Sequence, residues 1–252
     1  MAKIYLINVG ANTSDSNRAR SPIFQDGKWI YVPFIHKSGK PGENFPPATK
    51  QYTSKCEGIK CHLDPDWEHL TYGDCLDEPR SKALTKVQKN EILLFWALLW
   101  RTNQSDSVFE SKEKGWYLIG AVRVEYALKS SEQIQALAPS IRDRALLNAH
   151  VEDGRIKKGD VVFVGSPNLR HSRRFERAVD WEVYRDGGLM QRVVSTAKGE
   201  EIQWHKQPKW NSVTRACRAI LDLDKKNDRH LAELLARRIE KHNPEFALID
   251  GL

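Results

Sequence analysis

The sequence lacks any apolar run long enough to cross a bilayer. Its longest, "ILLFWALLW" at residues 92–100, is about half the length that a spanning helix needs and suits a buried strand. We therefore predict no membrane partner. No basic leader followed by an apolar segment precedes the first strand-like stretch, so we also expect no secretory signal and a cytoplasmic location.

Cysteine is scarce as well, with four residues in a chain of 252, which excludes a scaffold built on disulfides. Cys56, Cys61 and His62 lie close together, and His69 and Cys75 follow. Zinc sites usually take their ligands from two close pairs, and no second CxxC or HxxxH pair is present. We predict no metal site and interpret these residues as half-buried thiols and surface imidazoles. A metal bound by Cys56, Cys61, His62 and Cys75 stays the open alternative, and no motif indicates a cofactor, whose identity is unknown.

Acidic residues are fewer than basic ones, which gives a net charge of +7 and a pI of about 9.2. A basic balance of this size favours attraction to polyanions such as nucleic acid, without indicating sequence specificity. The alternative is a surface that is merely rich in arginine and lysine.

Regular alternation of strands and helices is also missing. The first two-thirds of the chain read as strands at residues 3–9, 91–100, 116–128 and 157–166, with a hairpin at 22–35 that turns at Asp26-Gly27. Helices are predicted later, at residues 131–137, 141–150, 213–221 and 231–239. Ser130 with Gln133 forms a capping box for the first of these helices, and Ser140 is the predicted cap of the second. Strands followed by helices indicate the α+β class with a mixed sheet and helices concentrated in the C-terminal third.

Small polar groups follow the first predicted strand in "NVGANTSDSNRARS". A strand fixes the backbone at its end, so the loop can turn its side chains toward a cleft. Asn8, Asn12, Thr13 and Ser21 are therefore candidates for reading a base edge or a sugar, and Arg20, like Arg18, for holding phosphate. The alternative is an ordinary asparagine-rich turn.

An acidic segment, "LDPDWEHLTYGD", covers residues 63–74. Carboxylates at this density suit general acid–base chemistry or a divalent cation. We take Asp66 and Asp74 as candidate catalytic bases, with Tyr72 or His171 assisting. An acidic surface loop remains the alternative.

Arginines dominate "GSPNLRHSRRFERAVDW" at residues 165–181, directly after a predicted strand. Arginine forks match phosphate geometry, and cations without matched acids repel one another unless an anion is present. Asn168, Arg173 and Arg174 are therefore predicted to bind the nucleotide. The alternative is a solvated basic segment.

Residues 85–185 resemble the small PUA-like barrels of the EVE/ASCH type, through "KGDVVFV" and its partners "ILLFW" and "WYLIGAV". Asn90-Glu91 stands where those barrels have Gly-Asp before the first strand. Such barrels bind RNA or extruded modified bases in an aromatic-lined cleft. The resemblance therefore implies that Trp96, with other aromatic residues nearby, offers a stacking face, although at least half of these rings should be core.

The order of the motifs "KIYLINVGANTSDS", "DPDWEHLTYGD", "ILLFWALLW", "GWYLIGAVRVE" and "GDVVFVGSPN" resembles the family called nucleotide modification associated domain three. That family was delineated in bacteria and phages by its association with DNA base modification and conflict systems. The resemblance implies one domain over residues 1–185, including the barrel-like strands, and a helical extension over 186–252 packed on it. It also implies a role in recognising or processing modified nucleotides.

The leading hypothesis is a reader that binds an extruded base or nucleotide of DNA, rather than RNA, in a cationic polar cleft. Its walls would come from residues 8–21, 64–74 and 168–177. One rival is an enzyme on the same substrate, such as a glycosylase or a nucleotide transferase or hydrolase. Another is a basic scaffold protein in phage defence. The sequence leaves open whether a reaction is catalysed and which protein partners bind.

Overall fold

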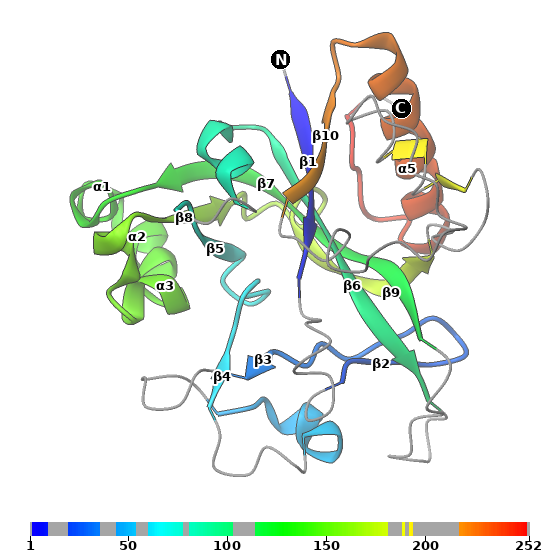
Figure 1. Ribbon diagram of the computed structural model, residues 1–252, viewed down its shortest axis with the longest axis horizontal. Helices are drawn as coiled ribbons and strands as arrows, with labels where there is room; N and C mark the ends of the chain where they lie inside the picture. Colours follow the sequence, from blue (N-terminus) through cyan, green and yellow to red (C-terminus); the bar gives the residue numbers. More distant parts are fainter. Residues whose placement is uncertain are drawn as a thin grey trace.

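The computed structural model describes residues 2–9, 20–35, 44–53, 60–77, 81–102, 114–180, 188–189, 192–193 and 217–250. In this part of the chain, a mixed sheet of eight strands carries helices at two ends (Figure 1). Its strands are β1 (Lys3–Asn8), β2 (Pro22–Ile23), β5 (Thr71–Cys75), β6 (Ile92–Arg101), β7 (Lys114–Leu128), β8 (Asp160–Gly165), β9 (Arg173–Asp180) and β10 (Cys217–Asp222). The predicted α+β class is confirmed.

The strand order is β10-β1-β6-β7-β8-β5, with β2 beside β6 and β9 beside β7. Strand β6 runs parallel to β1 and β2, and the other pairs of this sheet are antiparallel. Strands β3 (Phe34–Ile35) and β4 (Cys61–His62) form a separate antiparallel pair. Short 3-10 helices lie at Pro47–Tyr52 (η1), Lys82–Lys86 (η3) and Arg155–Lys158 (η4). The resemblance of residues 85–185 to a PUA-like barrel stays a prediction.

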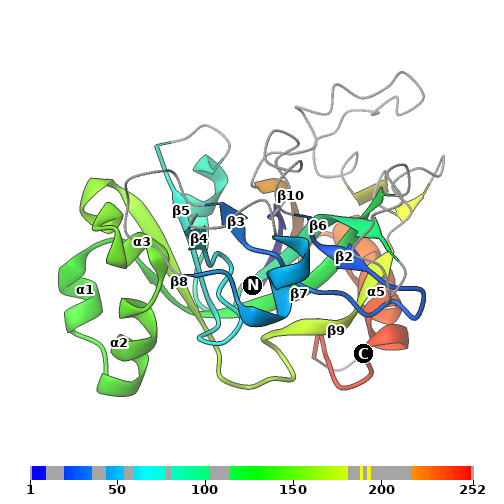
Figure 2. The same ribbon diagram turned by 90° about the horizontal axis from the view of Figure 1, so that it is seen from below.

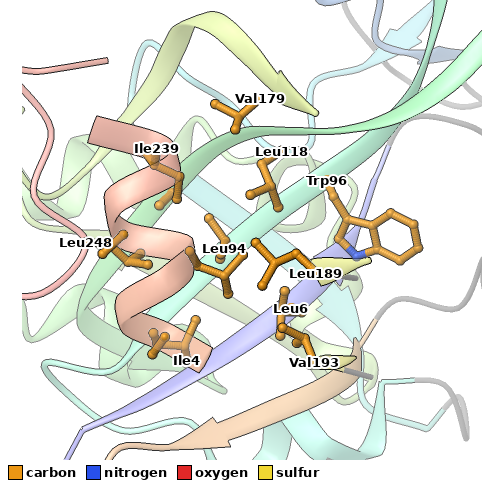
Figure 3. Close-up of a cluster of buried hydrophobic side chains, with 14 of the residues drawn as sticks. Ile4, Leu6, Leu94, Trp96, Leu118, Val179, Leu189, Val193, Ile239 and Leu248 are labelled. Carbon is orange, nitrogen blue, oxygen red and sulfur yellow. The ribbon is translucent and has the colours of Figure 1, made fainter. Parts of the chain in front are cut away.

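Both faces of the central strands are covered, which explains why β6 reads as a continuous apolar run. Side chains alternate along a strand, so Leu94 and Trp96 enter the core on one face while Leu93 and Phe95 enter the core on the other. The first core is closed by α5 (Lys226–His242), whose buried stripe includes Leu235. Figure 3 shows Ile239 and Leu248 meeting side chains of β1, β6 and β7.

Three short helices, α1 (Ser131–Gln135), α2 (Pro139–Leu146) and α3 (Ala149–Glu152), lie together at the end of the sheet opposite α5 (Figures 1 and 2). They cover Val162 and Val164 of β8. Ser130 caps α1 as predicted, because its Oγ accepts a hydrogen bond from the Gln133 N–H at 3.3 Å. The predicted cap at Ser140 is wrong. Helix α2 begins earlier, with Pro139 in its first turn and Ala138 before it, since proline is pre-organised for that position.

Two strands begin after a residue with positive φ. Gly159 (φ 96°) precedes Asp160 of β8, and Asn90 (φ 69°) precedes Glu91, the residue directly before β6. Asparagine tolerates this left-handed conformation better than other residues with a side chain. Asn90 therefore forms this turn without a glycine. The predicted turn at Asp26-Gly27 also forms, since Gly27 has φ 83° and the Phe24 N–H donates to the Lys28 carbonyl.

The helix predicted at 213–221 is wrong in its described part, because Cys217–Asp222 is strand β10 and pairs with β1. Residues 213–216 lie outside the described residues. The helix predicted over 231–239 lies within α5. A domain boundary at residue 185 stays a prediction. The described residues include no helix of the length and hydropathy that crossing a membrane requires.

Candidate active site

Asp66 shapes the loop between β4 and β5. Backbone hydrogen bonds in both directions join Asp66 and Thr71, at 2.9 and 3.1 Å, and close the loop. The Asp66 carboxylate accepts from the N–H groups of Glu68 (2.9 Å) and His69 (3.1 Å) and lies 2.7 Å from His69 Nδ1. The carboxylate is buried, and these bonds use it to hold the turn.

Asp74 lies on β5 and is surrounded by donors. Its carboxylate accepts from Tyr72 OH at 2.8 Å, from Ser81 Oγ at 2.7 Å and from the Cys75 N–H at 2.8 Å. Burial raises the pKa of the Asp74 carboxyl, although the hydrogen bonds from Ser81 and Tyr72 act in the opposite direction. Two of the predicted catalytic residues, Tyr72 and Asp74, thus contact each other directly.

This raised pKa predicts the sign of a pH effect on stability. Since the folded state binds the Asp74 proton more tightly than the unfolded state does, the favourable contribution is present at low pH and is lost as pH rises through the folded pKa. Asp74→Asn removes this titration. The free energy of unfolding of the wild type, minus that of the variant, should therefore fall as pH rises from about 4 to about 7. Urea unfolding at several pH values measures it. Asp224→Asn, at an exposed position, is the control, and a difference that grows with pH would contradict the assignment.

Asp64 brings two histidines together. Its Oδ2 lies 3.1 Å from His150 Nε2 and 3.6 Å from His62 Nε2, while its Oδ1 accepts from the Gly73 N–H at 2.8 Å. The two imidazole rings are 5.0 Å apart and nearly perpendicular. Burial opposes ionisation of Asp64, but hydrogen bonds from His150 and His62 outweigh it, and the pKa of the carboxyl is lowered.

Asp160, the first residue of β8, holds the other side of His150. Its Oδ2 lies 2.5 Å from His150 Nδ1 and 3.1 Å from Arg155 Nε. Burial would lower the pKa of His150, but its hydrogen bonds to Asp160 and Asp64 dominate and raise the pKa to about 9. The imidazole therefore donates to both carboxylates. We call His62, Asp64, His150 and Asp160 the histidine–carboxylate cluster.

Local sequence explains why His150 reaches this place. Asn148 caps α3, with its Oδ1 accepting from the His150 N–H at 3.0 Å, and its Nδ2 donates to Thr71 Oγ1 on β5 at 3.0 Å. Gly73 leaves the space that the ring occupies, because a Cβ there would lie 2.4 Å from His150 Cδ2. The cap, the glycine and the turn before β8 together fix the imidazole against the sheet.

The cluster meets the surface on the β4 side. The His62 side chain is 13% exposed, whereas those of Asp64 and His150 are 8% and 5% exposed. Small ligands would therefore approach past His62. Cys61 Sγ contacts the Asn44 carbonyl at 3.5 Å, and Cys75 is half buried. Cys56 lies outside the described residues.

His171, the fourth predicted catalytic residue, faces the C-terminal segment. Its ring lies 3.4 Å from the Ala247 carbonyl and 3.5 Å from Asp250. It shares no contact with Asp66, Tyr72 or Asp74 among the described residues. The structure thus brings three of the four predicted catalytic residues into one region, beside the cluster.

The predicted nucleotide-binding residues near the first strand have varied surroundings. Asn8 ends β1, and its Nδ2 is buried without a hydrogen-bond partner among the described residues. Ser21 accepts from the Val32 N–H at 3.0 Å and is buried. Trp96 has no exposed surface and packs edge-to-face on Trp116, so it lies in the core. Asn12 and Thr13 fall outside the described residues, and the convergence of 8–21, 64–74 and 168–177 on one cleft stays a prediction.

The arginine-rich segment begins with a turn. Asn168 Oδ1 accepts from the Arg170 N–H at 3.0 Å, and β9 follows. Arg173 pairs with Glu245 at 3.1 Å, so the assumption that these cations lack an acid partner was wrong for Arg173. The acid partner of Arg173 comes from a segment far away in the sequence, so the sequence alone does not show that this charge is paired.

Cations lie around Trp100 of β6 and around Trp29, which follows β2 in the chain. The Arg20 guanidinium lies 4.2 Å and the Lys114 ammonium 4.9 Å from the centre of the Trp100 ring, and Arg174 lies 5.5 Å from the Trp29 ring. Bridges join Ile23 to Trp29 and Lys28 to Arg177, and Ile23 pairs with Arg101. We call this set the basic strip: Arg20, Lys28, Arg101, Lys114, Arg174 and Arg177.

Tyr31 connects the basic strip to the cluster. Its ring meets the Trp29 ring edge-on at 6.2 Å, and its hydroxyl donates to the Asp64 carbonyl at 2.9 Å. Burial raises the pKa of Tyr31, with Asp64 adding to the effect, so the phenol stays neutral and donates. Trp29 and Tyr31 thus link Arg174 of the basic strip to Asp64 of the histidine–carboxylate cluster.

Sequence reasoning missed His150 and Asp160 as site residues. His150 lies 86 positions from Asp64 and ends a predicted helix, and Asp160 lies in a predicted turn. The single signal was Asp160 after Gly159, a turn that places a carboxylate at the start of a strand.

The profile of the family described as nucleotide modification associated domain 3 matches residues 3–231. The matched range contains every residue of the histidine–carboxylate cluster and of the basic strip. Neither the curated proteins nor the solved structures contain a significant match to the chain. Because the match spans most of the sequence, the chain belongs to the nucleotide modification associated domain 3 family.

Proposed function

We propose that this protein processes a modified nucleotide of DNA and that the histidine–carboxylate cluster is its reaction site. The observation that supports the proposal is the convergence of His62 and Asp64 with His150, from two chain segments far apart in the sequence, with Asp160 orienting the His150 ring. Family membership supplies the association with nucleotide modification.

Stability alone is a weak reason to keep such a cluster. Removing a charged group from water costs several kcal/mol, and well-packed apolar residues in place of a buried ion pair are often as stable or more so. Asp64, His150 and Asp160 are nonetheless all buried. Buried titratable groups with specific partners are typical of functional sites, which favours processing over pure recognition.

The test compares DNA nucleosides before and after incubation with the protein. Genomic DNA from a phage that carries modified bases is treated, digested and analysed by mass spectrometry, with unmodified plasmid DNA alongside. The wild type should change the amount of at least one nucleoside, and His62→Asn should lower that rate by about a hundredfold or more, as for loss of a group acting at the reacting atoms. His230→Asn, an exposed histidine on α5, is the matched control. Nucleoside profiles identical to those without protein would refute the proposal.

A second candidate, a reader of DNA, is favoured by the basic strip. Arg20 and Lys114 lie over Trp100 and Arg174 lies over Trp29, so these rings hold the cations in place. Such cations suit the phosphate backbone, and the affinity that phosphate contacts contribute falls as salt rises.

Arg20→Ala combined with Lys114→Ala should reduce the steepness of this salt dependence. Each lost phosphate contact removes about 0.9 from the slope of log affinity against log salt, so the double variant should lose about 2. Fluorescence anisotropy with a duplex oligonucleotide at several salt concentrations measures the slope. Replacing Lys226 and Arg237 of α5 by Ala is the control, and a double variant with the wild-type slope would exclude the strip as the DNA contact.

A further inference from the structure

We propose that His62, Asp64 and His150 bind a divalent transition-metal ion such as Zn²⁺, Fe²⁺ or Mn²⁺. This inference rests on the proposed function, because it names the cofactor of the same cluster. The donor atoms His62 Nε2, Asp64 Oδ2 and His150 Nε2 come from β4, the loop after it and α3, and they lie within 4.8 Å of one another.

The spacing of these atoms suits a common ion. Two ligands at 2.0–2.2 Å from a tetrahedral ion are about 3.3–3.6 Å apart. Asp64 Oδ2 lies 3.6 Å from His62 Nε2 and 3.1 Å from His150 Nε2. Small side-chain rotations would therefore bring all three donors to bonding distance.

Two atoms of the ligand side chains that would not face the ion already have protein partners. Asp160 holds His150 Nδ1 at 2.5 Å, and the Gly73 N–H holds Asp64 Oδ1 at 2.8 Å. Arg155 fixes Asp160 in turn, at 3.1 Å. A carboxylate on the far nitrogen of a ligating histidine is the usual second-shell arrangement at metal sites, since it orients the ring and raises its basicity. The ion would replace the proton that otherwise joins His150 Nε2 to Asp64.

The ligand types define the class of ion. Two imidazole nitrogens and one carboxylate oxygen suit first-row transition ions and zinc, whereas Mg²⁺ and Ca²⁺ prefer sets of oxygens. Three protein ligands leave further positions for water or substrate, as in catalytic sites. Such an ion supplies Lewis acidity toward a phosphate or carbonyl oxygen, on the exposed His62 side.

Cobalt is the probe, because bound Co²⁺ reports its ligands through visible absorption. The 252-residue chain is dialysed against chelator and titrated with CoCl₂ alone, and then with ZnCl₂ or a hundredfold excess of MgCl₂ as competitor. We expect one Co²⁺ per chain, displaced by Zn²⁺ and retained in Mg²⁺. His62→Asn should bind at least tenfold more weakly, and His230→Asn should bind like the wild type. Since His62 is partly exposed, this variant should fold, which circular dichroism checks.

Asp160→Asn tests the positioning role of the second carboxylate. It should weaken Co²⁺ binding by about 10- to 100-fold and alter the absorption spectrum without changing the stoichiometry. Absence of saturable Co²⁺ binding, displacement by Mg²⁺, or equal affinity in the wild type and His62→Asn would overturn the metal site. Nucleoside processing by a protein that binds no metal would leave the proposed function standing, and metal binding without processing would leave the metal site standing.

Discussion

Gly73→Ala should lower the free energy of unfolding by about 3 kcal/mol, although it adds a single methyl group. The added Cβ would lie 2.4 Å from His150 Cδ2, 2.6 Å from His150 Cγ and 2.9 Å from Asn148 Oδ1. These atoms cannot retreat easily, because His150 is tied to Asp160 and Asp64 and Asn148 caps α3. Either β5 shifts or the ring leaves its two carboxylates, and each response costs stability.

Urea unfolding followed by circular dichroism measures this loss, and Gly154→Ala is the matched control. Gly154, unlike Gly73, has positive φ, at 66°, and nothing lies within 4 Å of a Cβ there. Its substitution should cost about 1–2 kcal/mol from backbone strain alone and should leave Co²⁺ binding unchanged. Gly73→Ala should lose both stability and Co²⁺ affinity. A Gly73→Ala protein as stable as the wild type would mean that His150 does not pack against β5.

The central strands could be predicted because their signal is local. Strands β1, β6, β7 and β8 are rich in β-branched, aromatic and apolar residues, and β6 and β8 follow recognisable turns. Asn90 and Gly159 supplied the same positive φ before two of them. Residue type and turn chemistry were therefore sufficient to predict these strands.

Strand β10 could not be predicted because its pattern is ambiguous. Ile220 and Leu221 fit a helical stripe, yet in a strand covered on both faces they enter opposite cores. What decides the outcome is pairing with Tyr5 and Ile4 of β1, more than two hundred positions earlier. Short apolar runs with both faces buried lose the alternation that would identify them.

The candidate site likewise contains some residues that the sequence places together and others that only the fold brings together. Asp66, Tyr72 and Asp74 lie within one loop and strand, so sequence proximity alone placed them together. His150 and Asp160 join Asp64 only through the pairing of β5 with β8 and the position of α3. No spacing rule connects residues that a sheet brings together.

Residue type also misleads when burial is unknown. Trp96 has the ring that a stacking platform needs, but β6 places it fully inside the first core. Trp100 and Trp29 are buried as well, yet each has a cation over its ring. The sequence alone does not distinguish an aromatic ring deep in the core from one that lies under a cation, and only the tertiary structure does.

Asp160→Leu should lower the free energy of unfolding by about 3–5 kcal/mol, the usual cost of removing one member of a buried ion pair. The Asp160 side chain is 3% exposed and accepts from both His150 Nδ1 and Arg155 Nε. Without it, a buried imidazole faces Asp64 on one side and an apolar group on the other. Urea unfolding in chelator measures the loss. Asp143→Asn, at an exposed position on α2, is the control and should stay within about 0.5 kcal/mol of the wild type.

A double-mutant cycle separates lost packing from an orphaned charge. In His150→Phe the two carboxylates lose the group that both contact, so that variant should also be strongly destabilised. Once His150 is absent, however, Asp160→Leu removes a carboxylate that still contacts Arg155, instead of taking one of two partners from a buried imidazole. The second substitution should then cost about 2–3 kcal/mol less than it does in the wild type, which is the upper range for residues in direct contact. Additive losses would mean that Asp160 stabilises the protein by packing alone and would remove the reason to treat it as the residue that orients His150.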